Sequence, residues 1–150
     1  ALAVAQEETG LAGAKTSAFA HRPDVAIVVD VTFATDQPGV ELGEITEHGL
    51  GAGPVIARGT NIHPQVFELL YQVAEENQIP FSVESVGRGT GTDADAIHIS
   101  RAGIPTGLIS APCRYMHSPV EMVSVEDLDA TARLIAAFAQ KLEPGQSFQR

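Results

Sequence analysis

Hydrophobic and polar positions follow two different spacings along this chain, and the two spacings alternate. Residues 25–29 (VAIVV) form a continuous apolar run, which is typical of a strand buried on both faces. Residues 62–77 instead carry apolar side chains at helical spacing, with Pro64 where the first turn of a helix tolerates proline. The same reasoning predicts further strands at 1–5, 54–57, 81–86 and 104–110, and further helices at about 10–19, 93–101 and 125–142.

The order of these elements predicts the fold class. Strands and helices that alternate from end to end indicate an α/β protein with a mostly parallel sheet and helices on both faces. Residues 1–150 form one domain in this interpretation, and residues 34–53, with five glycines and a proline, form a long loop with at most a short strand. Because the first predicted strand starts at residue 1 without an initiator methionine, we expect the natural chain to begin earlier.

Composition narrows the classes of function. The net charge of −10 argues against sequence-independent binding of nucleic acid, which needs a basic surface to replace phosphate counterions. No apolar run approaches the roughly 20 residues of a membrane span, so no membrane partner is expected. The single cysteine, Cys113, is expected to be buried and cannot form an internal disulfide, which fits a reducing compartment and a cytoplasmic protein.

Acidic side chains and a histidine follow several of the predicted strands. Glu7 and Glu8 come after the first strand, Asp30 comes after the second, and His117 lies in the loop after the last. Alone, each has an ordinary explanation as a solvated surface, turn or packing residue. Ligand sites of open α/β sheets, however, gather at the carboxyl ends of the strands. The coincidence of carboxylates and an imidazole at one edge therefore favours metal chemistry.

Four motifs in fixed order connect these residues to a known family. They are residues 6–15 (QEETGLAGAK), 29–34 (VDVTFA), 91–94 (GTDA) and 115–121 (YMHSPVE). Together they resemble the deblocking and glutamyl aminopeptidases, which assemble as tetrahedral, dodecameric particles. The resemblance covers essentially the whole chain. It implies a zinc-exopeptidase-like fold, two divalent metal ions (zinc or cobalt), short peptide substrates and a homo-oligomer.

The resemblance also implies a role for each candidate residue. Glu7 would be the general base, Glu8 and His117 would bind one metal ion, and Asp30 would bind the other. These roles agree with the chemistry of the side chains, because carboxylate oxygens and imidazole nitrogens are the ligands of catalytic zinc sites. A carboxylate beside such a site can accept a proton from water and pass it to the leaving amine.

The chain also departs from the family pattern. The family has two further metal ligands upstream, a histidine and an aspartate that bridges both ions, and a small inserted domain used in assembly. None of these can be matched in this sequence. We therefore expect residues 1–150 to be the C-terminal portion of the catalytic domain, with three of five ligands, weak or no metal occupancy, and no activity in isolation.

Two other functions remain open at this point. Relatives of the family have been labelled endoglucanases, and a pair of carboxyl groups about 5 to 9.5 Å apart suits glycoside hydrolysis. That mechanism, however, has no use for Asp30 and His117. The third interpretation is a catalytically inactive, truncated domain that only assembles with partners.

Other conspicuous residues have structural explanations. The stretch 87–91 lacks the lysine and hydroxyl of a phosphate loop and is expected to form a mobile loop at the rim of the site. Thr92-Asp93 is expected to cap the following helix, with support of the site as the alternative. His63 is expected at the entry of the helix that starts at Pro64. Three more histidines are expected on the surface: His21, His48 and His98.

Overall fold

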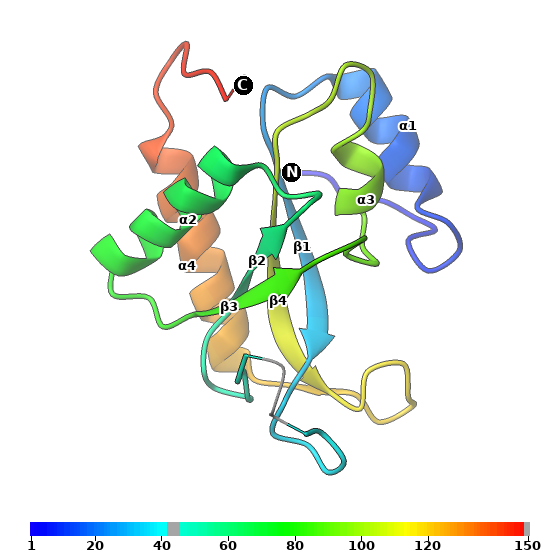
Figure 1. Cartoon of the computed structure of the whole chain (residues 1–150), viewed down its shortest axis with the longest axis vertical. Helices are drawn as coiled ribbons and strands as arrows, with labels where there is room; N and C mark the ends of the chain where they lie inside the picture. The colour runs from blue at the N-terminus through cyan, green and yellow to red at the C-terminus, as the bar shows by residue number, and fades with distance from the viewer. Residues whose placement is uncertain (42–45, 149–150) are drawn as a thin grey trace.

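A five-stranded sheet runs through the centre of the molecule, with helices on both of its faces (Figure 1). The computed structural model describes residues 1–41 and 46–148. In chain order, the elements are α1 (Ala12–His21), β1 (Ala26–Phe33), β2 (Val55–Gly59), α2 (Pro64–Glu76), β3 (Ser82–Val86), α3 (Ala94–Ile97), β4 (Thr106–Arg114), β5 (Met122–Val123) and α4 (Val125–Lys141). The α/β class predicted from the sequence is confirmed.

The strands follow the order β1-β4-β2-β3, and β5 pairs with β4. The parallel pair β1–β4 has eight paired residues and the parallel pair β2–β3 has five, whereas each of the antiparallel pairs, β2–β4 and β4–β5, has two. Most of the ladder is therefore parallel, as predicted. The antiparallel contact between β2 and β4 is invisible in the hydrophobic pattern, because Val55, Ile56 and Ala57 are all buried and a continuous apolar run does not reveal the direction of its neighbour.

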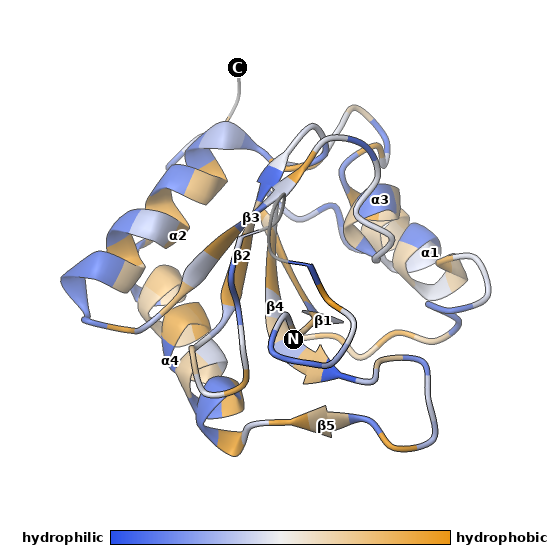
Figure 2. Cartoon of the chain, turned by 60° about the horizontal axis from the view of Figure 1, so that its bottom comes forward, coloured by the Kyte–Doolittle hydropathy of each residue, from blue (hydrophilic) through white to orange (hydrophobic). Residues whose placement is uncertain are grey.

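The core lies mainly between the sheet and the two long helices α2 and α4. Ile56, Leu70, Ile109 and Leu134 are completely buried there. Helix α2 approaches β4 closely at Gly107, where an added Cβ would lie 2.8 Å from a methyl carbon of Val66. In Figure 2 the strands are mostly hydrophobic, whereas α2 and α4 carry hydrophobic and hydrophilic sides. This pattern explains why helical spacing located both helices correctly.

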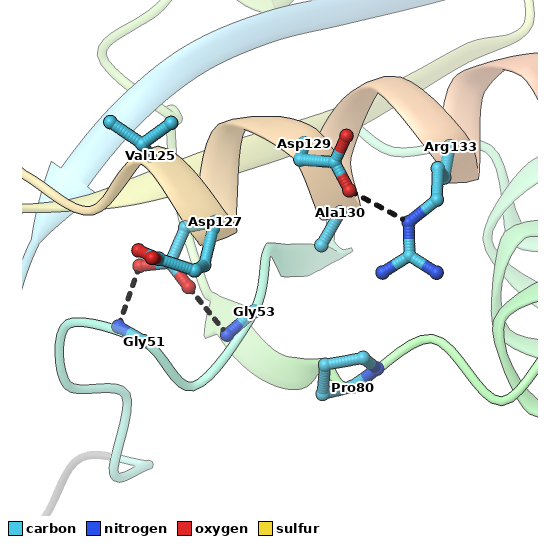
Figure 3. A pocket seen from close by; sticks show the side chains of 9 residues that line it. Gly51, Gly53, Pro80, Val125, Asp127, Asp129, Ala130 and Arg133 are labelled. Atoms are coloured by element: carbon cyan, nitrogen blue, oxygen red, sulfur yellow. Dashed lines mark hydrogen bonds and ion pairs between the residues drawn. The ribbon is translucent and has the colours of Figure 1, made fainter.

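One buried carboxylate ties the segment before β2 to the start of α4. Asp127 is 1% exposed, and its two oxygens accept hydrogen bonds from the backbone N–H groups of Gly51 (2.8 Å) and Gly53 (2.7 Å). Figure 3 shows these two contacts beside Pro80. Gly53 has a φ of +90°, and an added Cβ would lie 2.0 Å from the carbonyl oxygen of Pro80. Only glycine fits this close approach.

The strand predicted at residues 1–5 is wrong. These residues have no regular secondary structure. Only the end of the segment contacts α1, where the N–H of Gly13 donates to the carbonyl oxygen of Ala5 at 3.0 Å. Five apolar residues form a strand only beside a partner strand, and none of the described strands pairs with them. The helix predicted at 93–101 is also shorter than expected, because α3 covers only Ala94–Ile97.

The structure confirms three predictions about the burial or position of single residues and contradicts a fourth. Cys113 is buried, His63 is the residue just before α2, and His21 is exposed, as predicted. His48 was expected on the surface but is only 4% exposed. His48 is held beside the buried Thr35 by two hydrogen bonds: Thr35 N donates to His48 O, and His48 N donates to the Thr35 hydroxyl, both at 2.9 Å.

His98 is half-buried rather than on the surface, and its Nδ1 lies 2.9 Å from the carbonyl oxygen of Ala94. None of the helices in the described part of the chain is long and apolar enough to cross a membrane.

Candidate metal centre

The adjacent glutamates Glu7 and Glu8 lie in a turn that leads into α1, not at the end of a strand. The carbonyl oxygen of Glu7 accepts backbone hydrogen bonds from Gly10 (3.3 Å) and Leu11 (3.2 Å), which closes this turn. The turn places the two glutamates in different surroundings, because Glu7 is half-buried and Glu8 is exposed. The two neighbouring glutamates therefore differ in solvent exposure, which is compatible with different roles.

His117 reaches Glu8 from the loop between β4 and β5. Its Nε2 lies 3.4 Å from the Glu8 carboxylate. The His117 backbone has a φ of +64°, an uncommon conformation for a residue with a side chain, and its N–H donates to the carboxylate of Glu121 at 2.6 Å. The ring of Phe33 meets the imidazole edge-on at 6.2 Å. This loop conformation and the Phe33 contact hold His117 at the glutamates.

Asp30 lies inside β1, opposite Ser110 of β4. The expectation that it ends the strand is wrong, because residues 31–33 continue the ladder with residues 111–113. Asp30 is half-buried, and this burial raises the pKa of its carboxyl group. The backbone N–H of Val31, which donates to Asp30 Oδ1 at 2.7 Å, opposes that effect. The negative charge of Glu8 raises the pKa of Asp30 further.

The electrostatics of Glu7 indicate that the carboxylates form one cluster. The pKa of Glu7 is raised first by burial and then by the negative charges of Asp30, Glu8 and Asp93, while His117 acts in the opposite direction. These groups come from four separate segments of the chain. The structure places Glu8 and His117 in direct contact. The charges that act on Glu7 link Asp30 and Asp93 to this pair.

Asp93 immediately precedes α3, but it does not cap this helix. The capping bond comes from Thr92, whose hydroxyl accepts from the N–H of Ala94 at 3.2 Å, whereas Asp93 makes no side-chain capping bond. The Asp93 Oδ1 atom is buried and has no hydrogen-bond partner among the described residues. The sequence predicted capping by Thr92-Asp93, with support of the site as the alternative, and the capping prediction holds for Thr92 but not for the Asp93 side chain.

The glycine-rich stretch 87–91 is anchored by Asp95. The Asp95 carboxylate accepts hydrogen bonds from Thr90 N (2.8 Å), the Thr90 hydroxyl (2.7 Å), Gly91 N (3.0 Å) and Asn61 Nδ2 (2.9 Å). Burial opposes ionisation of Asp95, but these hydrogen bonds outweigh it and lower its pKa. Beside this loop is a cavity of about 380 Å³, whose lining includes Thr32 and Glu84.

The donor atoms of the cluster suit a divalent cation. Carboxylate oxygens and an imidazole nitrogen are the groups that bind zinc and similar ions, and several carboxylates held together repel one another without a cation. The buried, unpartnered oxygen of Asp93 fits the same interpretation. Within residues 1–41 and 46–148, however, no group of three or more His, Cys, Asp or Glu side chains is arranged so that it could hold a metal ion by itself.

Comparison with known proteins places the chain in a family. A family model described as M42 glutamyl aminopeptidase matches residues 1–134. This chain belongs to the M42 family. The lysyl aminopeptidase of Pyrococcus furiosus is 44% identical over 143 residues, which are 95% of this chain and 40% of the relative. The family resemblance found in the four sequence motifs is confirmed.

Solved structures agree with this family. An aminopeptidase from the archaeon Desulfurococcus kamchatkensis superimposes with a TM-score of 0.85 and 45% sequence identity, over 95% of this chain and 41% of that structure. The TET1 peptidase of Pyrococcus horikoshii superimposes with a TM-score of 0.69 and 31% identity, over 93% of this chain and 40% of that structure. The M42 chain thus spans about two fifths of the length of these proteins.

Proposed function

We propose that the complete protein containing this chain is a metal-dependent aminopeptidase, which removes N-terminal residues from short peptides at a dinuclear metal site. The observation that supports the proposal is the contact between Glu8 and His117 in an M42 chain, to which charge interactions link Glu7 and Asp30. The two further ligands expected from the family pattern, a histidine and a bridging aspartate, would come from the part of the complete protein that this chain does not span.

The proposed roles follow from the surroundings of each side chain. Glu8 and His117, whose nearest polar atoms are 3.4 Å apart, would bind one ion together, and Asp30 would bind the other. Such ions supply a water of lowered pKa and polarise the scissile carbonyl group. Glu7, half-buried and with a raised pKa, would accept the proton of the attacking water and deliver it to the leaving amine. Zinc and cobalt are the ions proposed.

The proposed partners are short peptides and further copies of the same protein. The Pyrococcus horikoshii peptidase is described as assembling into a tetrahedron or a large octahedral shell, which supports a homo-oligomer here. The proposed location is the cytoplasm. The net charge of −10 agrees with the absence of nucleic acid from the proposed partners.

Peptide hydrolysis at a metal site and glycoside hydrolysis require different functional groups. A glycosidase needs two carboxyl groups and no metal ligands. It would leave the contact between His117 and Glu8, and the burial of Asp30, without a function. The aminopeptidase proposal uses all four residues, so we prefer it to the endoglucanase alternative.

The test compares matched peptides with the complete protein. One peptide has a free N-terminus and the other is identical but N-acetylated, and release of the first residue is followed by mass spectrometry. We expect release only from the free peptide, loss of release after chelation, and recovery with zinc or cobalt. Equal cleavage of both peptides, full activity after chelation, or no cleavage with any residue at the first position would contradict the proposal.

A further inference from the structure

Asp93 has surroundings that a purely structural role does not explain. Its Oδ1 atom is buried without a hydrogen-bond partner among the described residues, and Thr92 already provides the capping bond to Ala94. A buried carboxylate oxygen without a partner loses its hydration and gains nothing in return, which costs free energy. A bound ion or ligand is one way in which such a group is satisfied.

The side chains near Asp93 make this arrangement still less favourable. The negative charge of Asp30 raises the pKa of Asp93, and the negative charge of Asp93 raises the pKa of Glu7. No described side chain donates a hydrogen bond to Asp93 Oδ1, and no positively charged group acts strongly on Asp93. Carboxylates whose charges act on one another, with no compensating cation, disfavour each other's ionised form.

Asp95, two residues further on, shows what a structural carboxylate looks like in the same segment. It accepts four hydrogen bonds from three residues, and these bonds lower its pKa. Asp93, by contrast, has a pKa raised by burial and then by the charge of Asp30. The two aspartates at the start of α3 therefore have opposite surroundings: one is stabilised as an anion by the protein, and the other is not.

We infer that Asp93 is a positioning residue of the metal centre: its carboxylate strengthens the binding of a divalent cation on the Asp30 side without being one of the direct ligands. This inference rests on the proposed function, because it concerns the same site. A cation held by Asp30 offsets the repulsion between Asp30, Glu7 and Asp93. The extra negative charge in turn increases the affinity for that cation.

The experiment measures zinc affinity and metal-free stability of the complete protein, for the native sequence and for Asp93→Asn. Zinc affinity is measured by competition with a chromogenic chelator, and the thermal midpoint is measured after the metal has been removed. We expect Asp93→Asn to bind the weaker zinc ion about tenfold less tightly or worse. We expect its metal-free midpoint to be unchanged or higher than native, because one repelling charge is gone.

Two further variants keep the outcome interpretable. Asp93→Glu, which restores the charge, should recover most of the zinc affinity, and Asp24→Asn, which alters an exposed aspartate, should change neither quantity. Native zinc affinity in Asp93→Asn would overturn the inference. So would a fall in the metal-free midpoint, since that result assigns Asp93 a structural role. These readouts do not use catalysis, so a protein that binds zinc normally but releases no N-terminal residue would refute only the proposed function.

Discussion

The imidazole of His117 lies 3.4 Å from the carboxylate of Glu8, although the two residues come from opposite ends of the chain. The parallel pairing of β1 and β4 places His117, which follows β4, beside Phe33 at the end of β1. Glu8 reaches the same imidazole from the turn before α1. Both side chains are more than half exposed, so the pair adds little to stability as an ion pair. The contact matters because it places a carboxylate oxygen and an imidazole nitrogen, both able to bind a metal ion, side by side.

The first prediction concerns Glu7. In the complete protein, Glu7→Gln should lower the rate of peptide hydrolysis about a hundredfold or more, because the amide cannot accept a proton. Both metal ions should remain bound, since Glu7 is not proposed as a ligand. Hydrolysis and metal content are measured on the same preparation, with the exposed Glu75→Gln as control. Near-native turnover would refute the role of Glu7, and loss of metal would indicate that Glu7 and Glu8 have exchanged roles.

The second prediction concerns His117. His117→Ala in the complete protein should lose about one equivalent of metal and most activity, because Glu8 alone holds an ion weakly. Elemental analysis after dialysis measures the loss. His21→Ala, which removes an exposed histidine at the end of α1, is the matched control and should retain both ions. Two tightly bound ions in His117→Ala would show that His117 is not a ligand.

The third prediction concerns the 150-residue chain in isolation. No described group of three metal-binding side chains is arranged to hold an ion in it, and catalytic zinc sites ordinarily use three protein ligands. We expect weak zinc binding in a calorimetric titration and no peptide hydrolysis. Tight binding of two zinc ions by this chain would contradict the idea that further ligands are needed.

The fourth prediction concerns the buried carboxylate of Asp127. Asp127→Asn replaces one acceptor oxygen with an NH₂ group that faces a backbone N–H of Gly51 or Gly53, so one charged hydrogen bond is lost. We expect a loss of about 1.5–3 kcal/mol in the free energy of unfolding by urea. Asp129→Asn on the same helix, where an exposed pair with Arg133 is lost, should change it by less than about 1 kcal/mol. Equal effects of the two substitutions would contradict the proposed anchoring.

The fifth prediction is a pH dependence at Asp95. Its pKa is lowered in the folded chain, despite burial, by the hydrogen bonds from Thr90, Asn61 and Gly91. A carboxyl group whose pKa is lower in the folded state stabilises the fold. This stabilisation is complete at pH values above the pKa of the unfolded state, about 3.9, and is lost as the pH falls through the pKa of the folded state. The difference in unfolding free energy between native and Asp95→Asn should therefore be constant near neutral pH and shrink below about pH 4. A difference that stays constant down to pH 2 would contradict this role.

The sequence by itself determined the elements with a strong period and the residues with distinctive chemistry. Helical spacing located α4 within one residue at its C-terminal end, because half of that helix faces a continuous core. The apolar run 25–29 identified β1, and the motifs around Glu7, Asp30 and His117 identified the M42 family. These features are local, so the order of residues along the chain contains them.

Only the tertiary structure decided the features that depend on distant neighbours. Residues 1–5 have a strand-like composition but none of the described strands pairs with them, and His48 is held beside the buried Thr35. The tertiary structure likewise decided that Thr92, and not Asp93, provides the capping bond of α3, and that Asp93 Oδ1 has no hydrogen-bond partner among the described residues. Burial and hydrogen bonding are properties of the surroundings of a side chain. Segments far apart in the sequence create these surroundings, and no local pattern records them.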